Sequence, residues 1–174
     1  MNNLASKHPR ESRATKISLV LPPDTNHHGT MFGGKLMAYI DDVATISATR
    51  HARHPVVTAS TDSVDFLHPI TQGNSVCVES FVTWAGRTSM EVFVKVTTED
   101  LLTGDRSICT IAFLTFVALD ENGKPTPVPS IVPETPQEIM LFESAEQRMA
   151  ARRDRRKQQE QLISTIGSKR HWEN

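Results

Sequence analysis

The chain has 174 residues, of which 38% are hydrophobic and 22% are charged, and its formal net charge is −1. These values are typical of a globular protein with one domain and an appendage, and they give no reason to expect nucleic acid or an anionic membrane as a partner. No apolar run approaches the roughly 20 residues that span a bilayer, and the polar N-terminus lacks the apolar core of a secretion signal. We therefore expect a cytoplasmic protein without a membrane segment.

The first third of the chain predicts a strand, a loop and a long helix. Residues 15–21, TKISLVL, have the composition of a short strand, which Pro22 ends, and the loop 24–32 follows. From residue 33 to about residue 50, apolar or small side chains recur at the helical spacing, on the line Leu36, Ile40, Val43 and Ser47. Because so little of this helix surface is polar, we expect other elements to wrap around it.

Four further strands are predicted after the helix, over residues 56–66, 75–84, 90–98 and 107–119. In the second of these runs the alternation places Val76, Val78, Val82 and Trp84 on one face, as in an antiparallel sheet with one covered side. The last run is apolar on both faces, which indicates a sheet interior or an oligomer interface. The order of elements predicts an α+β fold in which a curved antiparallel sheet surrounds one buried helix.

The character of the chain changes after residue 119. Residues 120–136 hold five of the ten prolines and predict an extended crossing or linker. Residues 137–164 predict one helix, whose segment 148–160 has six basic and two acidic residues. We interpret it as a solvated helix on the surface or on a neighbour, and the alternative is a helix that helps to bind an anionic ligand. The predicted division is a domain over 1–130 and an appendage over 131–174.

Two glycines, Gly33 and Gly34, stand where the long helix begins. They leave its first N–H groups free at the positive end of the helix dipole, where an anion or a developing oxyanion binds well. The alternative is a tight turn that merely needs small residues. Asp41 follows about two turns later among small and apolar neighbours, so we expect it to be partly desolvated and suited to act as a general base. Asp42 points elsewhere on the helix and is interpreted as a structural or surface residue.

Other polar residues near the helix give weaker signals. Asn26 can orient a water or a carbonyl, but asparagine is also common in loops for conformational reasons. His27 and His28 lack further ligands at a recognisable spacing, so we expect no metal site. Cys77 and Cys109 lie in strand-like runs with no base beside them, and buried reduced thiols are expected there rather than a disulfide.

One combination of segments resembles a known family. DTNHHGTMFGGKLMAYID, followed by VVTASTDSVDFLHPI, GRTSMEVFVKV and GKPTPVP, is similar to the hotdog-fold acyl-CoA thioesterases, and within them to the bacterial acyl-CoA hydrolases related to mammalian brain acyl-CoA hydrolase. The resemblance covers residues 15 to about 130. It implies a hotdog fold and hydrolysis of acyl-CoA to a free carboxylic acid and CoA, with CoA as part of the substrate and no cofactor.

The resemblance also implies roles for particular residues. Asp41 matches the catalytic aspartate, which activates water or attacks directly, Asn26 matches the loop asparagine, and a backbone N–H of Gly33 or Gly34 polarises the thioester carbonyl. The loop that meets CoA corresponds to Gly86, Arg87, Thr88 and Ser89. Two protomers share each active site in this family, and such dimers often form hexamers, so a homo-oligomer is expected.

Two alternative functions call for features that this sequence lacks. A non-catalytic acyl-CoA sensor would couple the hotdog domain to a DNA-binding helix-turn-helix, for which the 14 residues before the first strand are too few. A dehydratase that acts on acyl carriers has a pattern of a histidine and an acidic residue on a different loop. This sequence lacks that pattern. The retained Asp41 favours thioester hydrolysis over both.

Overall fold

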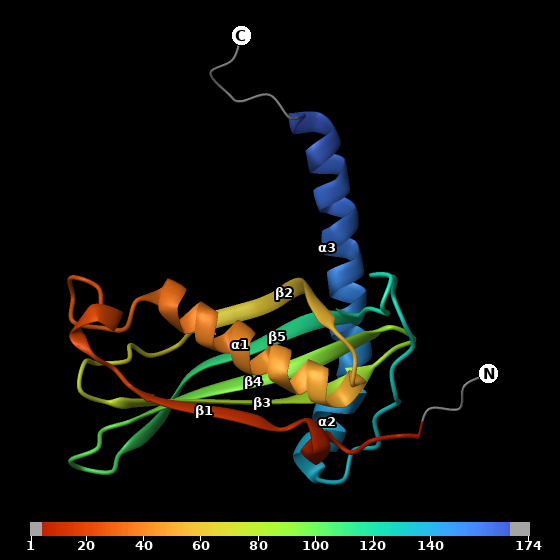
Figure 1. Cartoon of the computed structure of the whole chain (residues 1–174). Coiled ribbons are helices and arrows are strands. Elements are labelled where there is room, and N and C mark those ends of the chain that lie inside the picture. The colour runs from red at the N-terminus through yellow and green to blue at the C-terminus, as the bar shows by residue number, and fades with distance from the viewer. Residues whose placement is uncertain (1–4, 168–174) are drawn as a thin grey trace.

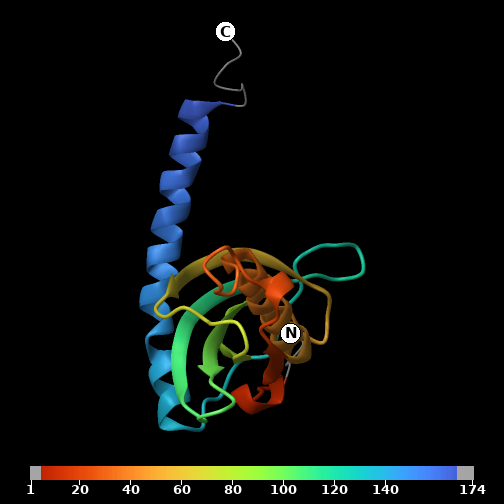
Figure 2. The same ribbon diagram turned by 90° about the vertical axis from the view of Figure 1, so that its left-hand side faces the viewer.

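A long helix lies inside a curved antiparallel sheet in the computed structural model, which describes residues 5–167 (Figures 1 and 2). In chain order the elements are η1 Pro9–Ser12, β1 Ala14–Leu19, η2 Pro22–Asp24, α1 Gly33–Ala52, β2 Val56–Phe66, β3 Ser75–Ala85, β4 Ser89–Glu99, β5 Arg106–Ala118, α2 Pro136–Glu143 and α3 Ala145–Ile166. The strands form one sheet in the order β1-β3-β4-β5-β2, with every neighbouring pair antiparallel. The predicted α+β hotdog architecture is confirmed. None of the helices within residues 5–167 is both long and apolar enough to cross a membrane.

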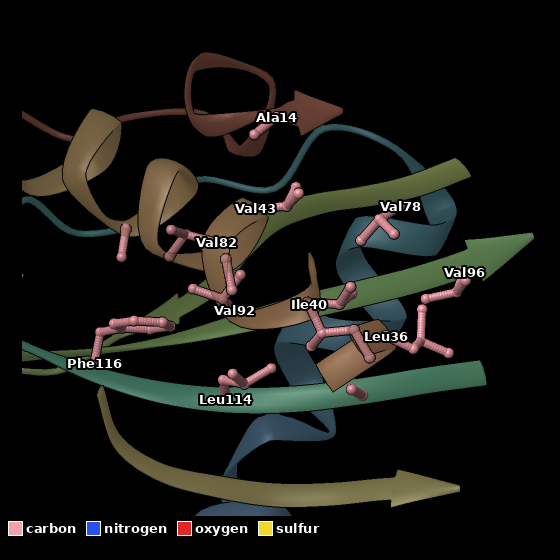
Figure 3. Close-up of a cluster of buried hydrophobic side chains, with 14 of the residues drawn as sticks. Ala14, Leu36, Ile40, Val43, Val78, Val82, Val92, Val96, Leu114 and Phe116 are labelled. Carbon is pink, nitrogen blue, oxygen red and sulfur yellow. The ribbon is translucent and has the colours of Figure 1, made fainter. Parts of the chain in front are cut away.

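The predicted apolar line of α1 forms the centre of the core. Leu36, Ile40 and Val43 are at most 3% exposed. Figure 3 shows them facing side chains of the sheet, among them Val78, Val82, Val92, Val96, Leu114 and Phe116. Burying an aliphatic side chain of this size contributes roughly 1.5–3 kcal/mol, so this contact holds α1 in one position against the concave face of the sheet.

The polar member of the same line is satisfied inside the core. Ser47 is fully buried, and its Oγ lies 2.6 Å from Oγ of Ser80 on β3. The Ser80 hydroxyl in turn donates to the carbonyl of Val43 at 3.0 Å. Since an unpaired buried hydroxyl is costly, this short chain of hydrogen bonds fixes how α1 is rotated and how far it is advanced along the sheet.

A bulge in β3 changes the face of one predicted core residue. Val82 pairs with Val92, but Trp84 pairs with Glu91, because Thr83 is an extra residue in this strand. Residues directly opposite each other point to the same side of a sheet. Glu91 belongs to the outer face, so the prediction that Trp84 shares the inner face with the valines is wrong. The sequence alternation is intact there, and only the extra residue redirects the side chain.

A second bulge, in the edge strand β2, sends two nearby side chains to opposite faces. Thr58 pairs with Phe116 of the core, whereas Ser60 pairs with Thr115 of the outer face. Ala59 between them is the extra residue. Thr58 therefore faces α1, and Ser60 faces the outside of the sheet.

The C-terminal segment forms two helices rather than the single helix predicted over 137–164. α2 begins with a capping box, in which Oγ1 of Thr135 accepts from the Glu138 N–H at 3.2 Å and the Glu138 carboxylate accepts from the Thr135 N–H at 3.1 Å. It ends at Ser144, whose hydroxyl donates to the Met140 carbonyl at 2.7 Å. Back-bonding of this kind bends helices, and the prediction of one continuous helix is wrong for this reason.

Both helices cover the outer face of the sheet, as Figure 2 shows along its left side. Leu141 of α2 packs on Phe93 and Phe113, with Phe81 beside them. This explains why the β5 run is apolar on both faces: α1 covers its inner side and the C-terminal helices cover part of its outer side.

Three arginines attach α3 to acidic residues of the sheet. Arg148 makes a two-pronged pair with Glu91, whose side chain is fully buried, at 2.7 and 3.0 Å. Arg152 and Arg155 both bind the carboxylate of Asp62, at 2.9 and 2.6 Å. The prediction of a solvated helix is therefore wrong for this part of α3. The spacing of these arginines puts them on one helix face, but nothing near them in sequence reveals their partners.

The proline-rich crossing runs back past the end of α1, as an extended segment without helix or strand between residues 120 and 135. Val128 and Ile131 are buried, and Nε2 of His51, at the C-terminal end of α1, donates to the Pro129 carbonyl at 2.8 Å. Burial lowers the pKa of His51, so this ring is neutral at physiological pH. The crossing is thus fastened to the core before α2 begins.

The Asp62 carboxylate is ionised despite its burial. Burial alone raises the pKa of Asp62, but hydrogen bonds from Ser60, Arg152 and Thr115 outweigh it and hold the pKa below its ordinary value of 3.8. A carboxyl group with a lowered folded-state pKa stabilises the fold above its unfolded-state pKa, and this contribution is lost as the pH falls through the folded-state value.

Replacing Asp62 tests how much the anchoring of α3 contributes. We expect Asp62→Asn to lower the free energy of unfolding at pH 7 by about 2 kcal/mol, because Arg152 and Arg155 lose their counter-charge while remaining partly exposed to solvent. Urea unfolding measures the difference. Asp65→Asn, which removes an exposed carboxylate of the same strand, is the matched control and should change stability by less than about 0.5 kcal/mol. The gap between wild type and Asp62→Asn should shrink progressively as the pH falls below about 4, toward the lowered folded-state pKa; a gap that has already closed above about pH 4 would contradict the lowered pKa.

Candidate functional site

The N-terminus of α1 presents free backbone donors. Phe32 precedes the helix in an extended conformation, and its carbonyl accepts the N–H groups of Lys35 and Leu36 at 2.9 and 3.1 Å. The N–H groups of Gly33 and Gly34 bond to no other residue within 5–167. These two donors stand at the positive end of a 20-residue helix, where a partial negative charge is stabilised.

Only one of these two positions is crowded by a neighbouring side chain. A Cβ on Gly34 would lie 2.5 Å from Cε1 of the Phe32 ring, whereas a Cβ on Gly33 would meet only Phe66 at an ordinary 3.7 Å. Gly33 instead borders a cavity of about 330 Å³, which Leu36, Phe66 and Ile70 also line. The helix terminus therefore opens onto a mostly apolar hollow. Such a hollow can hold a hydrocarbon chain while the N–H groups at the helix start bind the carbonyl attached to that chain.

Asp41 lies on the outward side of α1, against the edge of the sheet. Its Oδ1 accepts a hydrogen bond from Oγ1 of Thr58 on β2 at 2.9 Å. The carboxylate is exposed in the single chain, so the expectation that small and apolar neighbours on α1 would desolvate it is wrong for the isolated protomer. The neighbours flank Asp41 without covering it, and it opens onto a groove of about 840 Å³ that Lys16, Ile17 and Ile46 also line.

Asp42 has the surface role predicted for it. Its carboxylate pairs with Lys16 of β1 at 3.1 Å and is 62% exposed. The Lys16 ammonium also lies 4.1 Å from the centre of the Tyr39 ring. These contacts tie α1 to the strand at the opposite edge from β2 and leave Asp41 as the acidic residue that faces β2.

Asn26 is held inside its own loop. Its Nδ2 donates to Oγ1 of Thr30 at 3.0 Å, and its Oδ1 accepts from the His28 N–H at 2.9 Å. Gly29, with φ of 72°, closes the turn with a hydrogen bond to the Asn26 carbonyl. This geometry agrees with the conformational interpretation of Asn26, and it also leaves one amide hydrogen of Nδ2 for an external acceptor.

The loop between β3 and β4 is fixed through its backbone. The Gly86 N–H donates to the Ser89 carbonyl at 2.8 Å, while the carbonyls of Arg87 and Thr88 accept from Val128 and Ala118 at 3.0 Å. Ser89 is already the first residue of β4. The Arg87 side chain is exposed, so it is free to meet a ligand.

The remaining candidates gain no further support. His27 and His28 contact each other, with ring centres 3.8 Å apart, and within residues 5–167 no three His, Cys, Asp or Glu side chains gather as metal ligands would. Cys77 and Cys109 are free thiols. Burial raises the pKa of both, which keeps them protonated and unreactive at neutral pH.

Sequence reasoning missed Thr58. It is the residue that orients Asp41, yet it lies 17 positions away and on another element. The string VVTAS contains it, but a threonine in a strand needs no explanation beyond strand propensity. Only the pairing of β2 with β5, and the packing of α1 beside it, brings Thr58 to the carboxylate.

The fold and the site together define a class of protein. One long helix enclosed by a five-stranded antiparallel sheet, with free N–H groups at the helix start and a carboxylate two turns later, is the arrangement of a hotdog-fold enzyme. The family model described as "Thioesterase superfamily" matches residues 28–104. The chain is 58% identical over 163 residues to the protein named "Uncharacterized acyl-CoA thioester hydrolase YkhA" of Bacillus subtilis. The match covers 94% of this chain and 95% of that protein. The chain belongs to the hotdog-fold thioesterase family.

Solved structures give the same result. A hexameric acyl-CoA thioesterase is 52% identical, with a TM-score of 0.86 over 87% of this chain and 97% of that one. An acyl-CoA hydrolase from Staphylococcus aureus, in complex with butyryl coenzyme A, coenzyme A and coenzyme A disulfide, is 45% identical, with a TM-score of 0.89 over 94% of this chain and 99% of that one. That hydrolase also has structures in which an aspartate, an asparagine or a threonine is replaced by alanine.

Proposed function

We propose that the protein hydrolyses the thioester of acyl-CoA and releases a free carboxylic acid and CoA. One observation carries the proposal: the same helix offers unpaired N–H groups at Gly33 and Gly34 and a hydrogen-bonded carboxylate at Asp41. The N–H groups suit the oxygen of a carbonyl under attack, and the carboxylate suits activation of the attacking group. The relatives that match almost the whole chain bear the names of acyl-CoA hydrolases.

The two halves of this site cannot serve one carbonyl within a single chain. Gly33 and Asp41 are eight residues apart on α1, and a rise of about 1.5 Å per residue separates them by roughly 12 Å. Donors to an oxyanion must lie about 3 Å from it. A complete site therefore requires the N–H groups of one protomer and Asp41 of a second, as in a dimer with shared active sites.

The edge strand β2 is the surface that suits this dimer. It is 11 residues long, pairs with no strand other than β5 within residues 5–167, and exposes Val57 and Phe66. Such an edge invites pairing with another copy of the same strand. Because Asp41 and Thr58 lie at this edge, pairing there would also cover the exposed carboxylate. A relative is a hexamer, and we propose that three such dimers assemble in the same way here.

In the proposed reaction, the Gly33 or Gly34 N–H of one protomer polarises the thioester carbonyl, and Asn26 of that protomer orients it. Asp41 of the other protomer either removes a proton from the attacking water or attacks the carbonyl carbon itself. The carbon–sulfur bond then breaks, and the sulfur leaves as the thiol of CoA after taking up a proton from the attacking water, through Asp41, or from solvent. Direct attack leaves an anhydride between Asp41 and the acyl group, and water then hydrolyses this anhydride to release the carboxylic acid and restore Asp41. Side chains and backbone donors supply every step, so the proposed chemistry needs no cofactor.

Thr58 is proposed to position Asp41. In the Staphylococcus aureus hydrolase, the asparagine and the aspartate that were replaced by alanine have the same sequence spacing as Asn26 and Asp41 here. The replaced aspartate and threonine of that hydrolase have the same spacing as Asp41 and Thr58. This matching order supports the choice of these three residues. The backbone-fixed loop Gly86–Ser89, with its exposed Arg87, is proposed to contact CoA.

Release of free thiol tests the activity itself. We expect the intact oligomer to release thiol from members of a panel of acyl-CoAs of increasing chain length. Asp41→Asn keeps the size of the side chain but removes its basicity, and it should lower kcat by roughly 10²–10⁴-fold. Asp42→Asn is the matched control. Asp42 is the next residue along the chain, its carboxylate pairs with Lys16 on the surface, and the variant should retain activity. No thiol release from any member of the panel would refute the proposed function.

The hydrogen bond to Asp41 gives a separate prediction. Thr58→Val removes the hydroxyl and preserves the shape, so Asp41 is less well oriented and kcat should fall about tenfold, with KM little changed. Thr61→Val, at an exposed threonine of the same strand, is the control and should behave as wild type. Equal kcat values for the two variants would show that Thr58 does not position the carboxylate.

Mixing two inactive variants tests the shared site. Asn26→Ala and Asp41→Asn are unfolded together and allowed to reassemble. A mixed dimer then holds one doubly altered site and one fully wild-type site, and since random pairing makes about half of the dimers mixed, about a quarter of all sites should regain activity. Mixed dimers that form, as mass spectrometry can verify, and yet stay inactive would rule out a site built from two chains.

A further inference from the structure

The far half of α3 projects beyond the sheet. Within residues 5–167, Arg155 is the last residue of α3 that hydrogen-bonds to the sheet, where it binds Asp62 and Ser60 of the edge strand β2. The helix then continues from residue 156 to Ile166, a length of roughly 16 Å. Figures 1 and 2 both show this part running past β2, away from the rest of the chain. We call residues 156–166 the projecting segment.

One side of α3 changes from basic to apolar at the edge of the sheet. Positions 148, 152, 155, 159, 162 and 166 are spaced alternately four and three residues apart, so they lie on one side of the helix. The first three are the arginines that bind Glu91 and Asp62, so this side faces the sheet. The last two are Leu162 and Ile166, with Ile163 beside them. The side of α3 that faces the sheet therefore becomes apolar where the sheet ends.

The projecting segment is amphipathic, although nothing in its own chain covers its apolar side. The opposite side carries four polar residues at the same alternating spacing, which are Arg153, Lys157, Glu160 and Ser164. This is the pattern of a helix that packs against another element on one side only. Yet Leu162, Ile163 and Ile166 are 56%, 68% and 53% exposed in the single chain. Because a short helical segment is marginally stable in water without such packing, the apolar side requires a contact that one chain does not provide.

The proposed dimer places a surface at this position. Two copies of β2 that pair as antiparallel neighbours across a two-fold axis form one continuous sheet. That axis is perpendicular to the sheet, so the outer faces of the two copies lie on the same side. The projecting segment leaves its own sheet at β2 on this side and therefore continues over the outer face of the partner. With neighbouring strands about 4.8 Å apart, the segment is long enough to reach over the partner's β2 and β5.

The outer face near this edge offers apolar surface to a second copy. A hollow of about 540 Å³ lies there beside α3, and Ala59, Val117 and Met149 supply its apolar lining. Val57 pairs with Val117 on the same face and is exposed. The rest of the lining consists of arginines of α3 and polar side chains, and the aliphatic stems of arginines pack well on apolar residues. A second copy joined at β2 would meet this surface.

We infer that the projecting segment of each α3 packs on the outer face of the partner subunit and holds the dimer together across the paired β2 strands. Leu162, Ile163 and Ile166 are buried in this contact, over the partner's β2 and beside the partner's α3. The two-fold axis makes the contact occur twice in each dimer. The binding of Arg152 and Arg155 to Asp62 aims the segment. The inference rests on the β2-paired dimer of the proposed function and goes beyond it by assigning a role to the uncovered end of α3.

Sedimentation over a range of protein concentrations tests this contact, in moderate urea if the wild-type oligomer is too tight to dissociate in buffer. The proteins are wild type, Leu162→Gln/Ile166→Gln, and the control Lys157→Gln/Ser164→Gln. Glutamine is a good helix former, so the first variant removes apolar surface and keeps the helix. The control introduces the same residue twice on the opposite side. Circular dichroism verifies that the helix content is the same in all three proteins.

We expect Leu162→Gln/Ile166→Gln to raise the concentration at which half of the dimers dissociate by about tenfold or more, because each dimer loses the apolar contact at two places. Lys157→Gln/Ser164→Gln should dissociate at the same concentration as wild type. Equal dissociation of the two variants would overturn the inference. So would loss of hexamers from the first variant with no weakening of its dimers, because the segment would then join dimers to one another.

Cross-linking identifies the surface that the segment touches. Ile166→Cys and Ser164→Cys are each labelled with a photoreactive maleimide, and wild type treated in the same way shows the products of the native cysteines. Oligomers are mixed from light and heavy isotope-labelled chains, so mass spectrometry shows which products join two chains. We expect Ile166→Cys to cross-link to peptides of β2 or α3 in a second chain far more than Ser164→Cys does. Cross-links within one chain alone would overturn the inference.

Thiol release decides the proposed reaction separately from this contact. If wild type hydrolyses no acyl-CoA but its dimers depend on Leu162 and Ile166, the proposed reaction fails and the inference stands. If wild type hydrolyses acyl-CoA and both double variants dissociate alike, the inference fails and the reaction stands. A wild type that is monomeric at every concentration would overturn both the inference and the shared site.

Discussion

The burial of α1 inside the sheet is the constraint on which the rest of the molecule depends. Leu36, Ile40 and Val43 are enclosed by strands, and the Ser47–Ser80 hydrogen bond fixes the rotation of the helix. The helix can therefore neither slide nor turn. Its N-terminal donors and Asp41 are therefore held at fixed places relative to the sheet. The rise of the helix separates them by roughly 12 Å, which is too large for both to act on one bond in one chain, so the proposed chemistry needs a second copy.

The two faces of the sheet divide the tasks. The inner face packs α1 and thereby places the reactive groups, whereas the outer face receives α2 and α3. The attachment of α3 combines an apolar contact at Leu141 with buried ion pairs at Glu91 and Asp62. Burying charges is expensive unless they are paired and hydrogen-bonded, so these pairs add more to the orientation of α3 than to net stability.

Periodic patterns made most of the fold predictable. The helical line on α1 and the alternation in β3 reflect burial, which repeats along each element and survives small local errors. The features that were missed are single events. The extra residue Thr83 redirects Trp84, and the hydroxyl of Ser144 ends a helix, and neither leaves a repeating trace. A repeating sequence pattern does not reveal a structural feature that occurs only once.

The site was predictable to a smaller extent, for a related reason. The glycines at the start of α1 are a local signal, and the structure places their N–H groups as expected. The exposure of Asp41 could not be deduced, because neighbours on its own helix do not determine what covers a side chain. The Thr58–Asp41 contact and the attachment of Arg152 and Arg155 to Asp62 join residues far apart in sequence. Such contacts follow from strand order and bulges, which exist only in the folded chain.

The bulge at Ala59 has a consequence for how this segment can evolve. If Ala59 instead paired regularly with a residue of β5, the side chains of Thr58 and Ser60 would point to the same face. The position of the bulge therefore decides which residues of β2 face α1 and which face outward. A slip of the pairing by one residue at this point would exchange the two faces as far as the second irregularity, between Thr61 and Ser63. Natural selection can replace side chains along β2 one at a time, but a change in this pairing would alter both surfaces of the strand at once.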